Sequence, residues 1–273
     1  MKKFMAMLLI GIMAMSFASC QSQTPYIGEN GNWWIGNQNL GIAPRDPQDE
    51  QGSSKTNKEN NSLSATEIAK ILKQSTVIVY GGKRGVSWSS GTGFVASKNG
   101  YIITLYSIIK NYDTIEIVTS DGQTKTGELM AYNEAENIAF IKVDCDFPVI
   151  PIGNSSDVSQ GEIVYAIGEK DNTLIFSHGV ISATDSVFTH TGTQYVYDTK
   201  TFLTDASFGD RSNCGVLANH EGKVIGLAFD LSSSIHHVLP INTIMKLVES
   251  VEKTGNCNNL VTENTQIRPL IGN

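Results

Sequence analysis

The side chains that could carry out covalent chemistry in this sequence are one cysteine beside a glycine, Cys214, and five histidines: His178, His190, His220, His236 and His237. A cysteine attacks a carbonyl as a thiolate, which needs a neighbouring imidazole or another positive charge to lower its pKa. His236 and His237 are adjacent on a predicted strand, so their rings point to opposite faces and cannot both bind one metal ion. No HExxH or paired CxxC motif occurs, and no metal or cofactor is expected.

Four segments between residues 64 and 253 form a recognisable pattern. They read SGTGFVASKNGYIIT (90–104), NEAENIAFIK (133–142), VIPIGNSS with GEIVYAIG (149–156, 161–168), and TDASFGDRSNCGVLAN with GKVIG (204–219, 222–226). Together they resemble the protease domain of the HtrA/Deg type of trypsin-like serine protease. The resemblance implies an all-β fold, a trypsin-like double β-barrel.

In that family a histidine, an aspartate and a serine perform the hydrolysis, and the aligned places here hold Ser107, Asn137 and Asn213. The serine hydroxyl attacks a carbonyl only if an imidazole takes its proton while a carboxylate orients that imidazole. A neutral hydroxyl at Ser107 and an amide at Asn137 can do neither. The resemblance therefore implies a pseudoprotease.

The loop around the nucleophile differs from the family in a second way. The family has glycine two residues before the serine, where the backbone forms the oxyanion hole, and this sequence has Arg211. An alignment shifted by one residue makes Cys214 an alternative nucleophile, with Arg211 as a nearby positive charge. The other interpretation of Cys214 is a small, buried thiol that fills space in the core.

The ligand site implied by the resemblance includes Arg211, Gly215, His236 and His237. The two histidines occupy the strand beside the pocket that would hold the residue before the scissile bond. One of their rings would narrow or cap that pocket, and the alternative is ordinary packing.

The N-terminus has a basic start, a short apolar stretch and small residues before Cys20. This pattern is typical of a secretory signal, and residues 17–20 resemble a bacterial lipobox. We expect a signal peptide at 1–19 and a lipid on Cys20 that holds the protein at the cell envelope, on the periplasmic face or the cell surface. The alternatives are a plain secretory peptide or an uncleaved anchor.

The charge balance argues against nucleic acid as a ligand. The chain has 20 basic and 27 acidic residues, a formal net charge of −7. Nucleic-acid binding needs a concentrated basic surface, and no cluster of lysine and arginine follows the leader. The membrane is expected to be contacted through the lipid anchor only.

Residues 20–63 are rich in Gln, Asn, Gly and Ser and predict a low-complexity tether after the lipidated cysteine. The tether includes Trp33 and Trp34, flanked by glycines, which resemble a short module of bacterial and phage surface proteins. Such a pair could dock on the domain, on a partner or on a sugar.

The folded domain is predicted at 64–254. A capping box at residues 64–67 predicts a short N-terminal helix, and apolar spacing over 242–253 predicts a C-terminal helix that ends at Gly255. Strands are expected at 75–80, 101–104, 114–118 and 138–143 in one barrel, and at 163–167, 174–181, 195–203, 223–229 and 236–239 in the other.

Residues 255–273 are expected to be a short C-terminal tail, with no PDZ domain. Beyond Cys20, the cysteines at 145, 214 and 257 permit one disulfide and one thiol, and 145 with 257 is the pairing to test first. The predicted function is a membrane-tethered module that binds an extended peptide or a partner protein. The alternatives are a hydrolase that uses Cys214 and a structural lipoprotein whose groove is closed by Arg211 or His237.

Overall fold

The computed structural model describes residues 26–27, 32–35, 38–42, 63–83, 86–98, 100–144, 147–192, 194–209, 214–229, 234–258 and 260–269. The chain divides into two compact units, Met1–Asn60 and Asn61–Asn273. Cys20, Cys145, Arg211 and Asn213 lie outside the described residues.

The first unit contains a small antiparallel sheet in the order β1-β2-β3. Its strands are β1 (Tyr26–Ile27), β2 (Asn32–Ile35) and β3 (Gln38–Ile42). Trp33 and Trp34 both lie in β2 and pair with residues of both neighbouring strands. The segment expected as a tether therefore has local secondary structure around its tryptophans, because adjacent short strands can pair without long-range contacts.

The second unit begins with α2 (Ala65–Ser75), and the predicted capping box is confirmed. The Ser64 side chain accepts a bond from the Glu67 N–H at 3.3 Å, while the Glu67 carboxylate accepts one from the Ser64 N–H at 2.8 Å. The helix buries Ile68 and Leu72 completely. This apolar stripe docks the helix on the barrel strands that follow.

The first barrel is closed, with the strand order β4-β5-β6-β9-β8-β7. Its strands are β4 (Thr76–Lys83), β5 (Ser87–Val95), β6 (Tyr101–Leu105), β7 (Ile115–Val118), β8 (Thr124–Asn133) and β9 (Ile138–Lys142). β8 was not predicted, because half of its residues, including Leu129 and Met130, are exposed and give no inward alternation.

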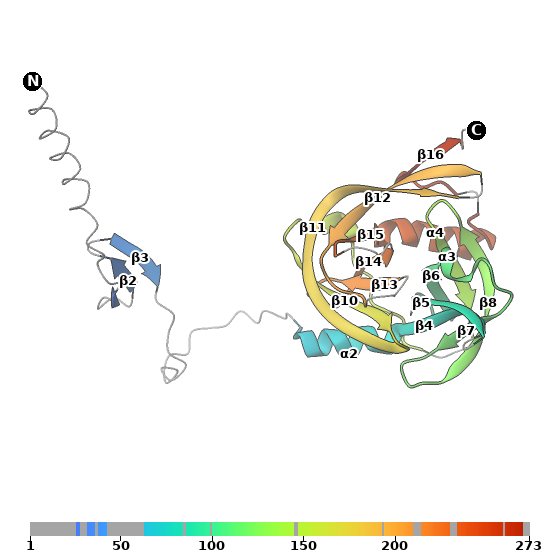
Figure 1. The fold of residues 1–273 in the computed structure, drawn as a ribbon, viewed down its shortest axis with the longest axis horizontal. Helices are drawn as coiled ribbons and strands as arrows, with labels where there is room; N and C mark the ends of the chain where they lie inside the picture. The colour runs from blue at the N-terminus through green and yellow to red at the C-terminus, as the bar shows by residue number, and fades with distance from the viewer. Residues whose placement is uncertain are drawn as a thin grey trace, which may run out of the picture. The chain divides into compact units, whose positions relative to one another are not determined.

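The second barrel is a sheet in the order β11-β10-β13-β14-β15-β12-β16, with β11 also paired to β12. Its first six strands are β10 (Ile163–Lys170), β11 (Thr173–Thr191), β12 (Tyr195–Thr204), β13 (Gly215–Ala218), β14 (Val224–Phe229) and β15 (His236–Pro240). In Figure 1, β11 and β12 form a long curved hairpin around one side of this barrel. The prediction of a trypsin-like double β-barrel is confirmed.

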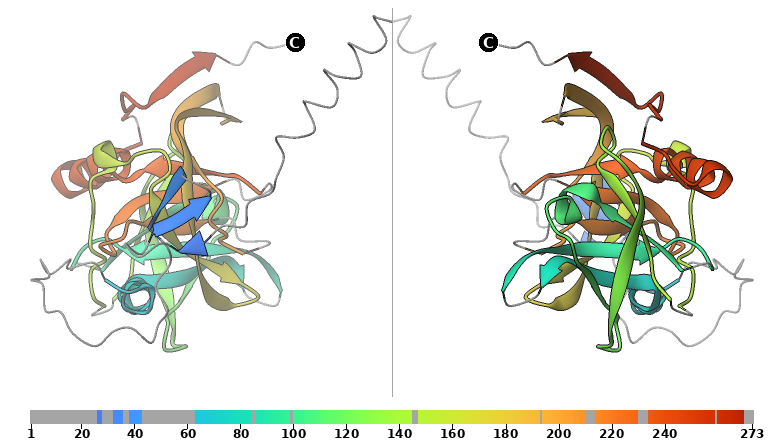
Figure 2. Two further views of the ribbon diagram at one scale, coloured as in Figure 1. Left: turned by 90° about the vertical axis from the view of Figure 1, so that its left-hand side faces the viewer. Right: turned by 90° about the vertical axis from the view of Figure 1, so that its right-hand side faces the viewer.

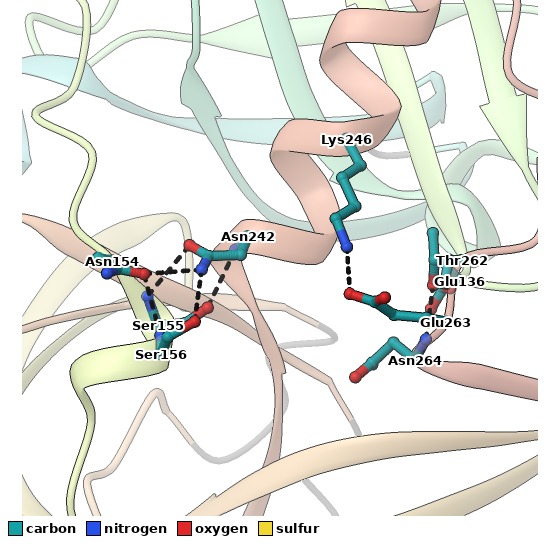
Figure 3. Close-up of polar contacts among 9 residues, drawn as sticks. All are labelled: Glu136, Asn154, Ser155, Ser156, Asn242, Lys246, Thr262, Glu263 and Asn264. Carbon is teal, nitrogen blue, oxygen red and sulfur yellow. Dashed lines mark hydrogen bonds and ion pairs between the residues drawn. The ribbon is translucent and has the colours of Figure 1, made fainter.

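The connector between the barrels is fixed to α4 (Ile241–Thr254), which includes the helix predicted at 242–253. Its short 3-10 turn η1 (Ser155–Asp157) lies beside Asn242. Ser155 and Asn242 each donate a backbone N–H to the other's side chain, both at 3.1 Å (Figure 3). Gly255 ends the helix with a φ of 76°, as its predicted capping role requires.

The segment after α4, expected as a tail, contributes to the folded domain. It forms β16 (Thr265–Pro269), which pairs antiparallel with residues 195–199 of β12 and lies at the outer edge of the sheet in Figure 2. The sequence TQIRP has no strand alternation, so sequence patterning did not show this strand. Tertiary contacts hold it in place.

One of these contacts is made by Glu136, a carboxyl in the turn between β8 and β9 that is buried against the C-terminal segment. It accepts bonds from the Thr262 hydroxyl, drawn in Figure 3, and from the Thr265 hydroxyl at 2.9 Å. Burial raises the pKa of Glu136, and the two hydroxyl bonds only oppose that effect. Ionisation of this carboxyl is therefore less favourable in the folded chain than in the unfolded one.

We expect the contribution of Glu136 to stability to fall as pH rises above its ordinary pKa near 4.5. The contribution is fully present below that value and is lost through the raised pKa of the folded state. Urea titrations at several pH values should show that Glu136→Gln gains stability relative to the parent as pH increases.

Glu263→Gln is the matched control, because Lys246 lowers the pKa of this exposed carboxyl (Figure 3). The stability that Glu263 contributes is lost as pH falls, so its titration has the opposite slope. If the free energy of unfolding of Glu136→Gln changes with pH as that of the parent does, the pKa of Glu136 is not raised.

Candidate functional site

Ser107 and Asn137, which the sequence resemblance aligns with the family's histidine and aspartate, meet at the end of β6. Ser107 lies in the single turn of α3 (Tyr106–Ile109), and Asn137 lies in the turn before β9 with a φ of 55°. The Ser107 N–H donates to Asn137 Oδ1 at 2.8 Å, and Asn137 Nδ2 donates to Ser107 Oγ at 3.2 Å. The structure therefore brings together two residues that sequence alignment assigned to one catalytic centre.

The two hydrogen bonds join the backbone and hydroxyl of Ser107 to the carboxamide of Asn137. The Asn137 amide satisfies the backbone and the hydroxyl of Ser107, as an orienting residue would satisfy a base. A serine hydroxyl and a carboxamide do not take up a proton near neutral pH. The arrangement is a polar contact that stabilises α3 and the turn before β9.

Cys214, the alternative nucleophile, lies in the interior just before β13. It is 0% exposed. Its Cβ approaches Gly91 so closely that a methyl group on that glycine would lie 3.3 Å away, and 2.3 Å from Ile108. Burial raises the pKa of the thiol to about 12, and bonds with the backbone of Leu105 and the side chain of Thr104 do not compensate. These properties favour the space-filling interpretation over the nucleophile.

Gly215, predicted to bind ligand, is buried against Phe208. A Cβ on Gly215 would lie 2.0 Å from Phe208 Cδ1, and one on Gly168 would lie 2.2 Å from the Phe208 carbonyl oxygen. Phe208 is itself fully buried. The glycine is needed for this packing, so the prediction of a direct ligand contact finds no support in its position.

His236 and His237 have separate surroundings on the two faces of β15. The buried His236 ring makes an edge contact with Phe208, at 5.6 Å between centroids. The half-buried His237 ring lies 5.0 Å from Phe188, and its Nδ1 is 2.8 Å from Thr201 Oγ1. His237 thus belongs to an aromatic cluster with Phe188 and with Phe229 at the end of β14, and His236 packs against Phe208.

A pocket that the sequence did not indicate lies next to the contact between Ser107 and Asn137. It has a volume of ≈ 600 Å³, and Tyr106, Tyr132, Tyr195, Tyr197 and Glu134 contribute to its wall. Tyr106 directly precedes Ser107 in α3 and stacks on Tyr132 at 4.2 Å. These residues come from segments far apart in the sequence, and no local motif connects them.

A second hollow, ≈ 530 Å³, lies between the connector and the β13–β14 turn. Asp157, Glu162, Glu221, His220 and Lys223 line it. Within the described part of the chain, no three His, Cys, Asp or Glu residues are arranged to hold a metal ion. Cys257 is a buried free thiol whose Sγ donates to the Tyr132 carbonyl at 3.5 Å. Cys145, the partner to test first, lies outside the described residues.

The fold defines the class of the protein. Two antiparallel β-barrels, joined by a connector that is fixed to a C-terminal helix, form the trypsin-like peptidase architecture. Residues 91–227 match the trypsin-like peptidase domain family. The chain belongs to this family.

Named relatives are consistent with the resemblance to the HtrA/Deg type. Serine protease HTRA1 of Xenopus tropicalis is 30% identical over 172 residues, which cover 61% of this chain and 37% of that protein. The probable periplasmic serine endoprotease DegP-like of Halomonas elongata is 28% identical over 174 residues, 61% and 36% of the two chains. The putative serine protease HhoB of Synechocystis sp. is 28% identical over 175 residues, 61% and 41%. The chain spans less than half the length of these relatives.

Proposed function

We propose that this chain is a catalytically inactive trypsin-like peptidase domain that binds an extended peptide or a partner protein without cleaving it. The observation that carries the proposal is the contact between Ser107 and Asn137 where the base and its carboxylate would lie. In a related kind of enzyme, loss of the nucleophile or the base alone lowers turnover by a factor on the order of 10⁶. Here the sequence places a non-catalytic residue at all three positions.

The scaffold that presents a peptide to such a centre supports the binding part of the proposal. The pairing of β13 with β14 reaches Gly215 and Ala228, and Phe229 continues β14 beyond that pair. On its other side Phe229 pairs with His237. Phe229 thus extends β14 by one residue past its pairing with β13, and a peptide that paired there would form backbone hydrogen bonds as an added strand.

The alternative of a cysteine hydrolase has no supporting observation. A nucleophilic thiol must be reachable and partly ionised, and Cys214 is buried with a raised pKa. The closed-groove alternative, in which Arg211 or His237 fills the site, predicts that no peptide binds. His237 is held by a hydrogen bond with Thr201 and by contact with the Phe188 ring.

We further propose that the domain is held at the bacterial cell envelope by a lipid on Cys20. The signal-like N-terminus and the periplasmic relative from Halomonas elongata support this location. No helix in the described part of the chain is long and apolar enough to cross a membrane. Metabolic labelling with an alkyne palmitate analogue should mark the chain and lose the mark in Cys20→Ala.

The proposal on activity is tested by incubating the purified chain with denatured casein and with a library of extended peptides. We expect no cleavage above that of buffer, because neither Ser107 nor Asn137 can take the proton that acyl transfer releases. Asn213→Ala and Cys214→Ala are prepared in parallel, and circular dichroism verifies their fold. Cleavage that one of these substitutions abolishes would overturn the proposal.

A further inference from the structure

The tyrosine pocket described above is built by four segments that meet beside α3. Tyr106 comes from α3, Tyr132 and Glu134 from the end of β8 and its turn, and Tyr195 and Tyr197 from β12. The segment after α4 closes the remaining side with Leu260, Val261 and Ile267. The pocket therefore depends on the C-terminal segment and on the β11–β12 hairpin together.

The pocket carries one negative charge. Glu134 is the only charged side chain among the described residues of its wall. Burial raises the pKa of Tyr106 and of Tyr197, and the Glu134 charge adds to both effects, so these hydroxyls stay protonated. The Nε2 of His190 lies 3.3 Å from the Glu134 carbonyl oxygen, and burial lowers the pKa of that ring, which favours its neutral form.

Packing against neighbouring residues holds the Glu134 carboxylate in the wall of the tyrosine pocket. The Tyr197 hydroxyl forms a hydrogen bond with Glu134. A Cβ on Gly192 would lie 2.5 Å from Tyr197 Cε2 and 3.0 Å from Glu134 Cδ. The glycine at the end of the hairpin therefore leaves the space in which the tyrosine and the glutamate meet.

Apolar surface surrounds this charge. Tyr106 and Tyr132 stack with an interplanar angle of 9°. At the rim, Tyr195, Val261 and Ile267 are 41%, 48% and 38% exposed. Aromatic rings next to a carboxylate attract organic cations through the ring quadrupole as well as the charge. An aliphatic rim also accommodates the methylene stem of a lysine or arginine.

We infer that this pocket binds the side chain of an arginine or lysine in a peptide ligand, with the cation beside Glu134 and its stem against the tyrosines and the aliphatic rim. An anionic ligand would be repelled by Glu134. The excess of 27 acidic over 20 basic residues in the chain also favours a basic partner. The inference rests on the proposed function only in that the ligand is a peptide.

The test compares two fluorescein-labelled decapeptides that differ only in a central arginine or its neutral isostere citrulline. Fluorescence anisotropy with the full chain should show the arginine peptide binding on the order of tenfold more tightly. Glu134→Gln should remove this difference and leave the affinity for the citrulline peptide unchanged. Glu263→Gln is the matched control, because it removes an exposed carboxylate from the C-terminal segment that borders the pocket. This variant should preserve the difference in affinity between the two peptides.

The outcomes separate this inference from the proposed function. Equal binding of both peptides to the parent chain would overturn the cation pocket and leave peptide binding intact. If neither peptide binds, the same chain is titrated with Nα-acetyl-arginine N-methylamide and followed by NMR. Shifts confined to the tyrosine pocket and absent in Glu134→Gln would support the pocket and contradict the peptide function, whereas no shift would overturn both. An equal loss of affinity in Glu263→Gln would show general charge attraction and overturn the specific pocket.

Discussion

Iodoacetamide is expected to alkylate Cys214 in the folded chain at least about 10³-fold more slowly than it alkylates an ordinary cysteine. Burial raises the pKa of this thiol from 9.0 to about 12, which at neutral pH lowers the thiolate population by a factor on the order of 10³. The side chain is also 0% exposed, so the reagent cannot reach it without local opening. The modified sites are read by mass spectrometry of peptides.

The same chain in urea is the control, because unfolding exposes Cys214 and should restore the rate of an ordinary thiol. Cys257 gives an internal reference, since burial also raises its pKa, to about 11. Fast, selective alkylation of native Cys214 would instead indicate an activated nucleophile. That result would support the alternative hypothesis that the chain is a hydrolase with Cys214 as its nucleophile.

Asn133→Ala is expected to lower the free energy of unfolding by about 3 kcal/mol. Asn133 is 0% exposed, and its side chain makes two bonds to the C-terminal segment and one within the turn between β8 and β9. Its Nδ2 donates to the Cys257 carbonyl at 2.7 Å and to the Leu260 carbonyl at 2.8 Å, and its Oδ1 accepts from the Glu136 N–H at 2.9 Å. The substitution leaves these buried groups with fewer partners.

Urea denaturation followed by intrinsic fluorescence measures the change. Asn256→Ala is the matched control on the same segment, because Asn256 is exposed and should change stability by less than about 0.5 kcal/mol. A loss below about 1 kcal/mol in Asn133→Ala would show that these bonds do not hold the turn.

The sequence predicted the roles of some residues of the candidate site and left the roles of others open. Ser107 and Asn137 were assigned to one centre because the flanking segments resemble those of a known family, and the structure joins them by two hydrogen bonds. Cys214 remained open, since its sequence neighbours do not show whether a side chain faces the groove or the core. Packing beside Gly91 and Ile108 places it in the core.

Local chemistry in the sequence determined the elements with short-range causes. The capping box at Ser64 predicted α2, Gly255 predicted the end of α4, and the apolar alternation predicted most of the barrel strands. Residue types alone also showed that the positions aligned with the family's catalytic residues have no imidazole and no carboxylate. These features depend on neighbours within a few positions of the chain, which a sequence displays directly.

The tertiary structure alone decided the features that join distant segments. β16 has no strand pattern and exists because β12 and Glu136 provide its partners. The tyrosine pocket exists because Tyr106, Tyr132 and Tyr197 come together from three elements beside Glu134. Such contacts lower the free energy only once the chain has folded, because each requires loops between remote residues to close first. No single stretch of sequence carries their pattern.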